Sequence, residues 1–295
     1  MFDLLLQLFG LILLLAGLWL GYRRWVQPYQ TSLDAQARGL LLLLVLAGMG
    51  GAIGSPFWWI DDVRSFAWDV PPLASRMLAA ASASFVVVCL MALEKPTYQR
   101  VRLVLILLTV YLLPLGVAIV LFHLDRFDPA NPLTYAFFII VILLVAAALW
   151  YLFRQPLIHA GDHNAAVAIS PAVRGWLVLV AMISGLWGLA LFVTDNGPYS
   201  LIWVWPGDLL SSRLIGVMMV AIAAAAVYSL RSAGAARPLL ALILTYGLGV
   251  AAASLWNLSA GRSVPFLYLA IFGFMAFLSA VLLFSEVIIA DGPPQ

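Results

Sequence analysis

Two arginines stand in the same short pattern, Trp-x6-Ser-Arg, in the two halves of the chain. The first copy runs from Trp68 to Arg76, and the second runs from Trp205 to Arg213, 137 positions later. Each arginine lies at the start of a long apolar segment, where the partial positive charge of a helix N-terminus disfavours a cation. We therefore expect a compensating anion, supplied by a nearby carboxylate, a lipid phosphate or a partner protein.

Two interpretations of this pattern remain open. Tryptophan suits the boundary between membrane and water, and arginine can reach the headgroups from inside an apolar segment. The simpler interpretation is two such arginines in an aromatic belt, with Asp69 or Asp208 as nearby counter-charges. The functional interpretation is a duplicated outer docking site for an anionic lipid or a neighbouring subunit. The residues of that predicted site are Trp68, Arg76, Trp205 and Arg213.

Histidines offer one possible metal-binding pair. His159 and His163 are four positions apart with Asp162 between them, a spacing that suits chelation on a helix. Pro156 and Gly161 argue against a regular helix there. A solvated loop is therefore favoured, and no metal site is predicted.

His123 is the remaining histidine, at the end of an apolar segment. It could ligate a haem or a pigment, but the chain contains no Cys-x-x-Cys-His sequence. At an offset of 133 its counterpart is Trp256, so a ligand role would not be duplicated. An interfacial histidine is favoured, no cofactor is predicted, and ligation by His123 stays an open alternative.

Signatures of catalysis are missing from the sequence. It contains no Gly-x-Ser-x-Gly, His-Glu-x-x-His or Walker sequence. The glycine-rich stretch at 48–54 lies within an apolar segment, where glycine favours close helix packing. Glu286 is the only acid near a predicted span, and no ionisable residue falls at mid-membrane. These features predict no catalytic residues and disfavour ion-coupled transport.

Composition indicates whether lipid or water surrounds the protein. Of the 295 residues, 65% are hydrophobic and only 9% are charged, so most of the surface must face lipid. The net charge of +2 and the absence of a basic run argue against a nucleic-acid partner.

Apolar runs of about the length needed to cross a bilayer recur along the chain, and backbone hydrogen bonding in lipid requires them to be helices. The sequence therefore predicts an all-α membrane protein with about nine transmembrane helices. The runs cover residues 4–20, 39–59, 74–93, 103–123, 133–153, 175–194, 209–230, 238–257 and 265–289.

Charge distribution predicts the orientation. Ten lysines and arginines fall in the loops that follow odd-numbered runs, and five fall on the opposite side. Basic residues are enriched in cytoplasmic loops, so the N-terminus is predicted outside and the C-terminus in the cytoplasm. The first run is followed, and not preceded, by Arg23 and Arg24, which favours a retained helix over a signal peptide.

Several short sequences recur in order along the chain. Besides the Trp-x6-Ser-Arg copies, Leu-Gly-Val-Ala at 115–118 recurs at 248–251, and Pro-x-x-Tyr at 132–135 recurs at 265–268. These matches predict two four-helix copies, and an even number of spans gives both copies the same orientation.

The predicted organisation has four parts. Residues 1–30 form a leading transmembrane helix, 31–156 the first repeat, 157–173 a cytoplasmic linker, and 174–295 the second repeat with a short C-terminal tail. The segments at 74–93 and 209–230 are rich in alanine and serine, which permit close approach in lipid, so both are expected near the centre.

Two segments resemble a known group of proteins. The sequence from Trp68 to Arg76, and the His-Leu-Asp-Arg-Phe-Asp sequence at 123–128, resemble bacterial multi-pass membrane proteins that carry a Trp-Pro…Leu-x-x-Arg element. That group is uncharacterised, so the resemblance implies a bacterial plasma (inner) membrane and no particular activity.

These features together predict a non-enzymatic subunit or scaffold of a larger membrane assembly. Its expected partners are membrane lipids and other integral membrane subunits, which it would dock at the outer tryptophan and arginine surface. The alternative is a transporter of a lipid or small solute, with its site between the two repeats.

Overall fold

The structure is a computed structural model that describes residues 2–156, 169–194, 208–262, 264 and 266–290. The protein is about 85% helical, and the described ranges contain no strand. The predicted all-helical fold is therefore confirmed.

Each predicted apolar run corresponds to one long helix. Eight of these helices, α2 to α9, are long and apolar enough to cross a membrane, while a membrane span for the 20-residue α1 stays a prediction. The helices are α1 (Phe2–Gly21), α2 (Ala35–Trp59), α3 (Pro72–Glu94), α4 (Tyr98–Phe122), α5 (Pro132–Arg154), α6 (Pro171–Val193), α7 (Leu209–Ser229), α8 (Ala233–Ser259) and α9 (Phe266–Ala290).

Short polar residues begin most of these helices by accepting a hydrogen bond from an otherwise unpaired backbone amide. Asp34 accepts from the amide of Ala37 at 2.6 Å at the start of α2. Asn131 and Ser170 cap α5 and α6, each followed by a proline whose missing N–H needs no partner. These caps set the helix starts locally.

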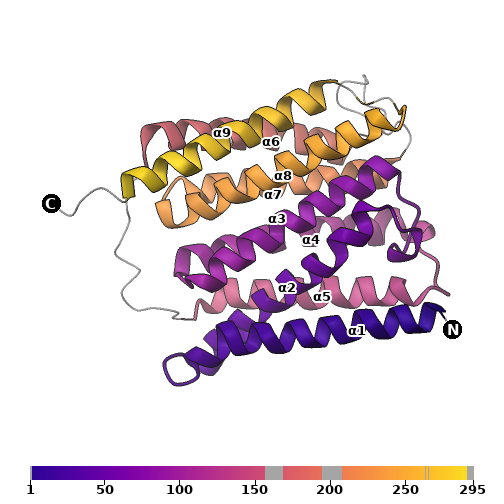
Figure 1. The fold of residues 1–295 in the computed structure, drawn as a ribbon, viewed down its shortest axis with the longest axis horizontal. Coiled ribbons are helices and arrows are strands. Elements are labelled where there is room, and N and C mark those ends of the chain that lie inside the picture. The colour runs from indigo at the N-terminus through magenta and orange to yellow at the C-terminus, as the bar shows by residue number, and fades with distance from the viewer. Residues whose placement is uncertain (1, 157–168, 195–207, 263, 265, 291–295) are drawn as a thin grey trace.

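Successive long helices run antiparallel, so the loops gather at two ends of the bundle (Figure 1). We call one of them the basic end, where α1, α3, α5, α7 and α9 finish and α2, α4, α6 and α8 begin. We call the opposite one the acidic end, because its described loops hold Asp61, Asp62, Asp69, Asp125, Asp128 and Asp208. The residues that define the basic end are Arg23, Arg24, Arg38, Lys95, Arg100, Arg102, Arg154, Arg174, Arg231 and Arg237.

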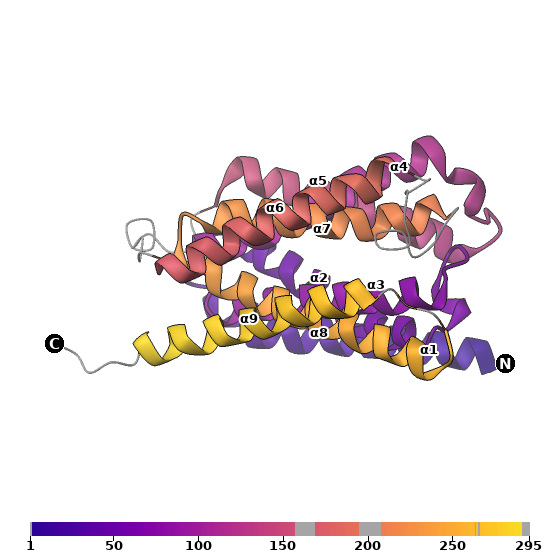
Figure 2. The same ribbon diagram turned by 90° about the horizontal axis from the view of Figure 1, so that it is seen from above.

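The helices form two layers, which Figure 2 shows one above the other. One layer holds α6, α7, α4 and α5 in that order, and the other holds α9, α8, α3, α2 and α1. Within a layer, α3 packs against α8, and α4 packs against α7. Each layer therefore joins helices from both halves of the chain.

The centre of the bundle is formed by α3, α7, α8 and α4. In the most apolar stretch of each span, 83% of the α7 residues and 61% of the α3 residues are buried, against 11% for α5. The expectation that the two alanine-rich helices lie centrally is thereby confirmed. By contrast, most residues of α5 are exposed or only half-buried.

Glycine permits the closest helix contacts in both layers. A Cβ atom on Gly188 of α6 would lie 2.7 Å from the carbonyl oxygen of Gly216 in α7, and one on Gly51 of α2 would lie 3.1 Å from that of Ser82 in α3. These approaches confirm that the glycines pack helices together, as close contact is the main source of association in lipid.

Candidate functional site

Arg213 forms a buried joint between three helices at the acidic end. It is the fifth residue of α7 and only 9% exposed. Its Nη1 atom lies 2.8 Å from Nε2 of His123, which directly follows α4, and its Nε donates to the Phe192 carbonyl of α6 at 3.2 Å. The guanidinium also lies 4.7 Å from the ring centre of Phe122. Hydrogen bonds and cation–π contacts thus connect α7 to α4 and α6.

The contact with Arg213 fixes the protonation state of His123. A guanidinium can only donate hydrogen bonds, so Nε2 of the imidazole must accept and the ring must be neutral, with its proton on Nδ1. Burial lowers the pKa of His123, and the nearby Arg213 charge lowers it further. The Nε2 lone pair that a haem or pigment metal could use is therefore engaged in this hydrogen bond.

Arg76 forms the corresponding joint in the other layer. It is the fifth residue of α3 and only 7% exposed. Its Nη1 donates to Oδ1 of Asn257 at 3.3 Å and to the Pro72 carbonyl at 3.1 Å, and the guanidinium lies 5.4 Å from the ring centre of Trp256. Asn257 and Trp256 belong to the last turn of α8. Arg76 therefore connects α3 to the end of α8.

The two joints use the same arrangement of residue types. In each, an arginine near the start of one helix contacts an aromatic residue and the polar residue after it, at the end of a helix from the other half of the chain. The contacts match Phe122 with Trp256 and His123 with Asn257, an offset of 134. The sequence offset of 133, taken from the other repeated segments, instead pairs His123 with Trp256.

Carboxylates near the joints have other roles. Asp208 caps α7, accepts a 2.6 Å hydrogen bond from the Ser211 hydroxyl and forms a 3.6 Å ion pair with Arg126. Within the described residues Arg76 forms no ion pair with a carboxylate, and its Nε atom, although buried, has no hydrogen-bond partner. Asp69, the predicted counter-charge, is exposed in the loop before α3.

Trp68 lies half-buried in an aromatic cluster. Its ring centre lies 4.9 Å from that of Phe127 and 5.4 Å from that of Phe137, so it joins the loop before α3 to α5 and to the loop before it. The structure thus brings Trp68 into the protein near the acidic end. Trp205, the fourth residue of the predicted docking site, lies outside the described residues.

The predicted histidine pair also lies outside the described residues, since His159, Asp162 and His163 fall within 157–168. Among the residues that the structure describes, no three histidine, cysteine or acidic side chains gather where they could hold a metal ion.

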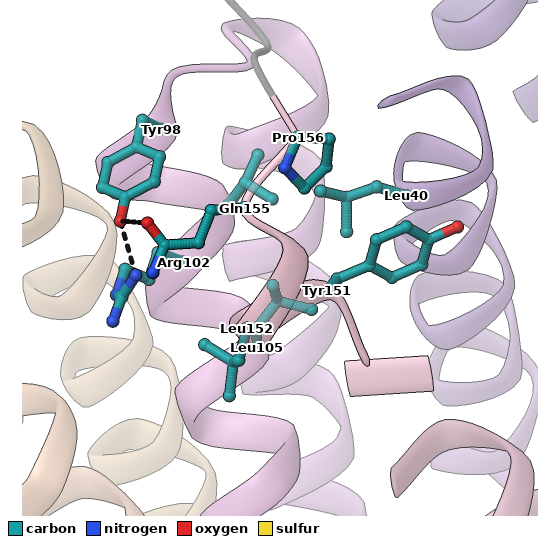
Figure 3. Close-up of a pocket in the computed structure, with 9 residues that line it drawn as sticks. Leu40, Tyr98, Arg102, Leu105, Tyr151, Leu152, Gln155 and Pro156 are labelled. Atoms are coloured by element: carbon teal, nitrogen blue, oxygen red, sulfur yellow. Dashed lines mark hydrogen bonds between the residues drawn. The ribbon is translucent and has the colours of Figure 1, made fainter. Parts of the chain in front are cut away.

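A small pocket opens at the basic end between α2, α4 and α5 (Figure 3). Arg102, Tyr98 and Gln155 form its polar side, and Leu40, Leu105 and Leu152 belong to its apolar side. Its volume of about 10 Å³ is close to that of one water probe.

Sequence reasoning missed His123 and Asn257 as partners of the arginines. The signal that could have found them is the recurrence of an aromatic–polar pair, Phe-His and Trp-Asn, at the ends of the fourth and eighth apolar runs.

Comparison of the chain with protein-family models, with curated proteins and with solved structures gives no match. The eight long apolar helices indicate a multi-pass membrane protein.

Proposed function

We propose that this protein is a non-enzymatic scaffold subunit of a larger assembly in a bacterial plasma membrane. In this proposal a leading helix precedes two four-helix copies, 31–156 and 174–295, which share one orientation. The observation that carries the proposal is the pair of matching arginine joints, because both buried cations connect helices to one another. Structural use of the buried charges is what a rigid framework requires.

The exchange of helices supports the proposed duplication. The joint at Arg76 connects the second helix of the first copy to the third helix of the second copy, and the joint at Arg213 makes the reciprocal connection. Reciprocal contacts of this kind arise when two equivalent units pack around a twofold axis. Because each copy has an even number of spans, that axis would run along the membrane normal.

The charge of the two ends supports the proposed orientation. The basic end holds ten of the fifteen lysines and arginines, which favours the cytoplasmic side for that end. The acidic end, with both joints, would then face outward, as the proposed docking of partners requires.

Exposed apolar residues at the acidic end support docking. The arginines and Trp68 hold this end together from within, so a partner would contact the loops that cover them. Ile60 and Val63, in the loop after α2, are 67% and 74% exposed, and Leu124, after α4, is 52% exposed. We propose that another integral membrane subunit covers these side chains with an apolar surface of its own.

The test is purification from the native membrane in a mild detergent, followed by identification of the chains that accompany the protein. The Ile60→Ala/Val63→Ala variant should lose its partner subunit. A matched control, Ile139→Ala/Ile142→Ala, changes residues of similar exposure on α5 and should retain it. Recovery of the wild type as a lone monodisperse monomer, or solute flux by the protein alone in liposomes, would contradict the scaffold role.

A further inference from the structure

We propose that the pocket between α2, α4 and α5 binds the phosphate group of an anionic membrane phospholipid. Arg102 would supply the cation, and Tyr98 and Gln155 would form a polar rim (Figure 3). This site lies at the opposite end of the bundle from the arginine joints, and it requires no partner subunit.

Arg102 has unused hydrogen-bonding capacity at the edge of this pocket. It lies half-buried in the second turn of α4, where its Nη1 donates to the Tyr98 hydroxyl. It forms no ion pair with a carboxylate in the part of the chain that the structure describes. A guanidinium offers five N–H donors in a fork that suits phosphate oxygens, so a phosphate is a natural counter-ion here.

The rim residues form a short chain of hydrogen bonds from Arg102. The Tyr98 hydroxyl donates to Oε1 of Gln155 at 3.1 Å. Gln155 follows α5 with a φ of 45°, in the left-handed region that non-glycine residues rarely adopt, and this turn directs its side chain toward Tyr98. Because Gln155 itself is exposed, its amide can turn outward and widen the entrance.

The pocket is placed where a lipid can enter from the side. Its apolar wall includes Leu40, Leu105 and Leu152, and the flanking helix α5 is the least buried of the eight candidate spans. Acyl chains can therefore lie along α5 while the headgroup reaches Arg102. The surrounding basic end attracts anionic lipids, and basic pockets between membrane helices are suited to their headgroups.

In this proposal the site has a closed form, which the structure shows, and an open form that binds the lipid. Room for about one water molecule cannot accommodate a phosphate, so binding requires the Gln155 side chain to swing away from Tyr98. The phosphate oxygens would then replace the Gln155 amide as the acceptor for the Tyr98 hydroxyl and would accept hydrogen bonds from Arg102.

The binding test uses the full-length purified protein in detergent. Bound lipid is counted by native mass spectrometry, and apparent affinity is measured from the thermal midpoint during titration with phosphatidylglycerol, phosphatidylcholine or inorganic phosphate. Wild type should bind phosphatidylglycerol in preference to phosphatidylcholine. Arg102→Gln should weaken phosphatidylglycerol binding about tenfold or more, the equivalent of one good charged contact. The control Arg154→Gln removes an exposed arginine that does not line the pocket and should bind like wild type.

A second variant separates binding from folding. Gln155→Glu places a carboxylate beside Arg102 and should keep the pocket closed through an ion pair. It should weaken phosphatidylglycerol binding at least as much as Arg102→Gln, without lowering the thermal midpoint of the lipid-free protein. Wild-type binding by Gln155→Glu, equal losses in Arg102→Gln and Arg154→Gln, no preference for phosphatidylglycerol, or protection by inorganic phosphate in place of lipid would each overturn the proposal.

Discussion

Arg213 of α7 and His123 at the end of α4 are 90 positions apart in the chain, yet their side-chain nitrogens lie 2.8 Å apart in a buried contact. The contact holds only while the imidazole is neutral, because a protonated ring has no lone pair to offer and would repel the guanidinium. One proton therefore separates a hydrogen bond from a like-charge pair at this position.

The first prediction is that mild acid weakens the protein at this joint. Folding lowers the pKa of His123, so below its ordinary value of about 6.5 the unfolded chain binds the proton more readily than the folded protein does. Stability should thus be fully present above that pH and decline as the pH falls below it. The thermal midpoint in detergent, measured between about pH 8 and 5, would show the decline.

The control for this prediction comes from the other joint. His123→Asn gives Arg213 the uncharged acceptor that Asn257 provides to Arg76, and it should flatten the midpoint over that range. The other charged groups that act on His123 are Asp125, Arg126 and Asp208, and all three are retained in this variant. An equally steep decline in the His123→Asn variant would assign the acid sensitivity to another group.

The second prediction concerns the acceptor of Arg76. Asn257→Leu should lower the free energy of unfolding by about 1–3 kcal/mol, because a buried guanidinium would lose one of its hydrogen-bond partners. Denaturation monitored by circular dichroism would measure the loss. Ser259→Ala, at an exposed position two residues later in α8, should change stability by less than about 0.5 kcal/mol. Similar values for the two variants would show that Arg76 does not depend on Asn257.

The third prediction compares two glycines of α6. Gly188→Ala should destabilise the protein by about 1–3 kcal/mol, since the new Cβ would lie 2.7 Å from the Gly216 carbonyl and force α6 away from α7. Gly175→Ala meets nothing within 4 Å and should be neutral or slightly stabilising, because alanine is the better helix former. Thermal midpoints of the two variants measure the difference, and an equal effect would argue against close α6–α7 packing.

The fourth prediction concerns orientation in the membrane. In a Cys89→Ala background, Val63→Cys at the acidic end should react with a membrane-impermeant thiol reagent added to intact cells. Lys95→Cys at the basic end should react only after the membrane is opened. Val63 and Lys95 are both exposed, so access to the reagent depends on the side of the membrane. Labelling in the reverse order would invert the orientation that the charge distribution predicts.

Much of the helical framework was predictable because its causes are local. A run of apolar residues as long as a bilayer is thick must form a helix, and caps such as Asp34 and Ser170 define where it begins. The small residues of α3 and α7 also indicated the centre of the bundle correctly, since close packing in lipid depends on side-chain size.

What the tertiary structure decided is the set of partners for Arg76, Arg213 and Trp68. The sequence singled out these residues. It does not specify which helices become neighbours, because all of the long helices are apolar and hydrophobicity does not distinguish one pair from another. The two-layer packing brings the ends of α8 and α4 to the two arginines. It also packs Trp68 against Phe127 and Phe137, because the loop before α3 meets α5 and the loop before α5 at the acidic end.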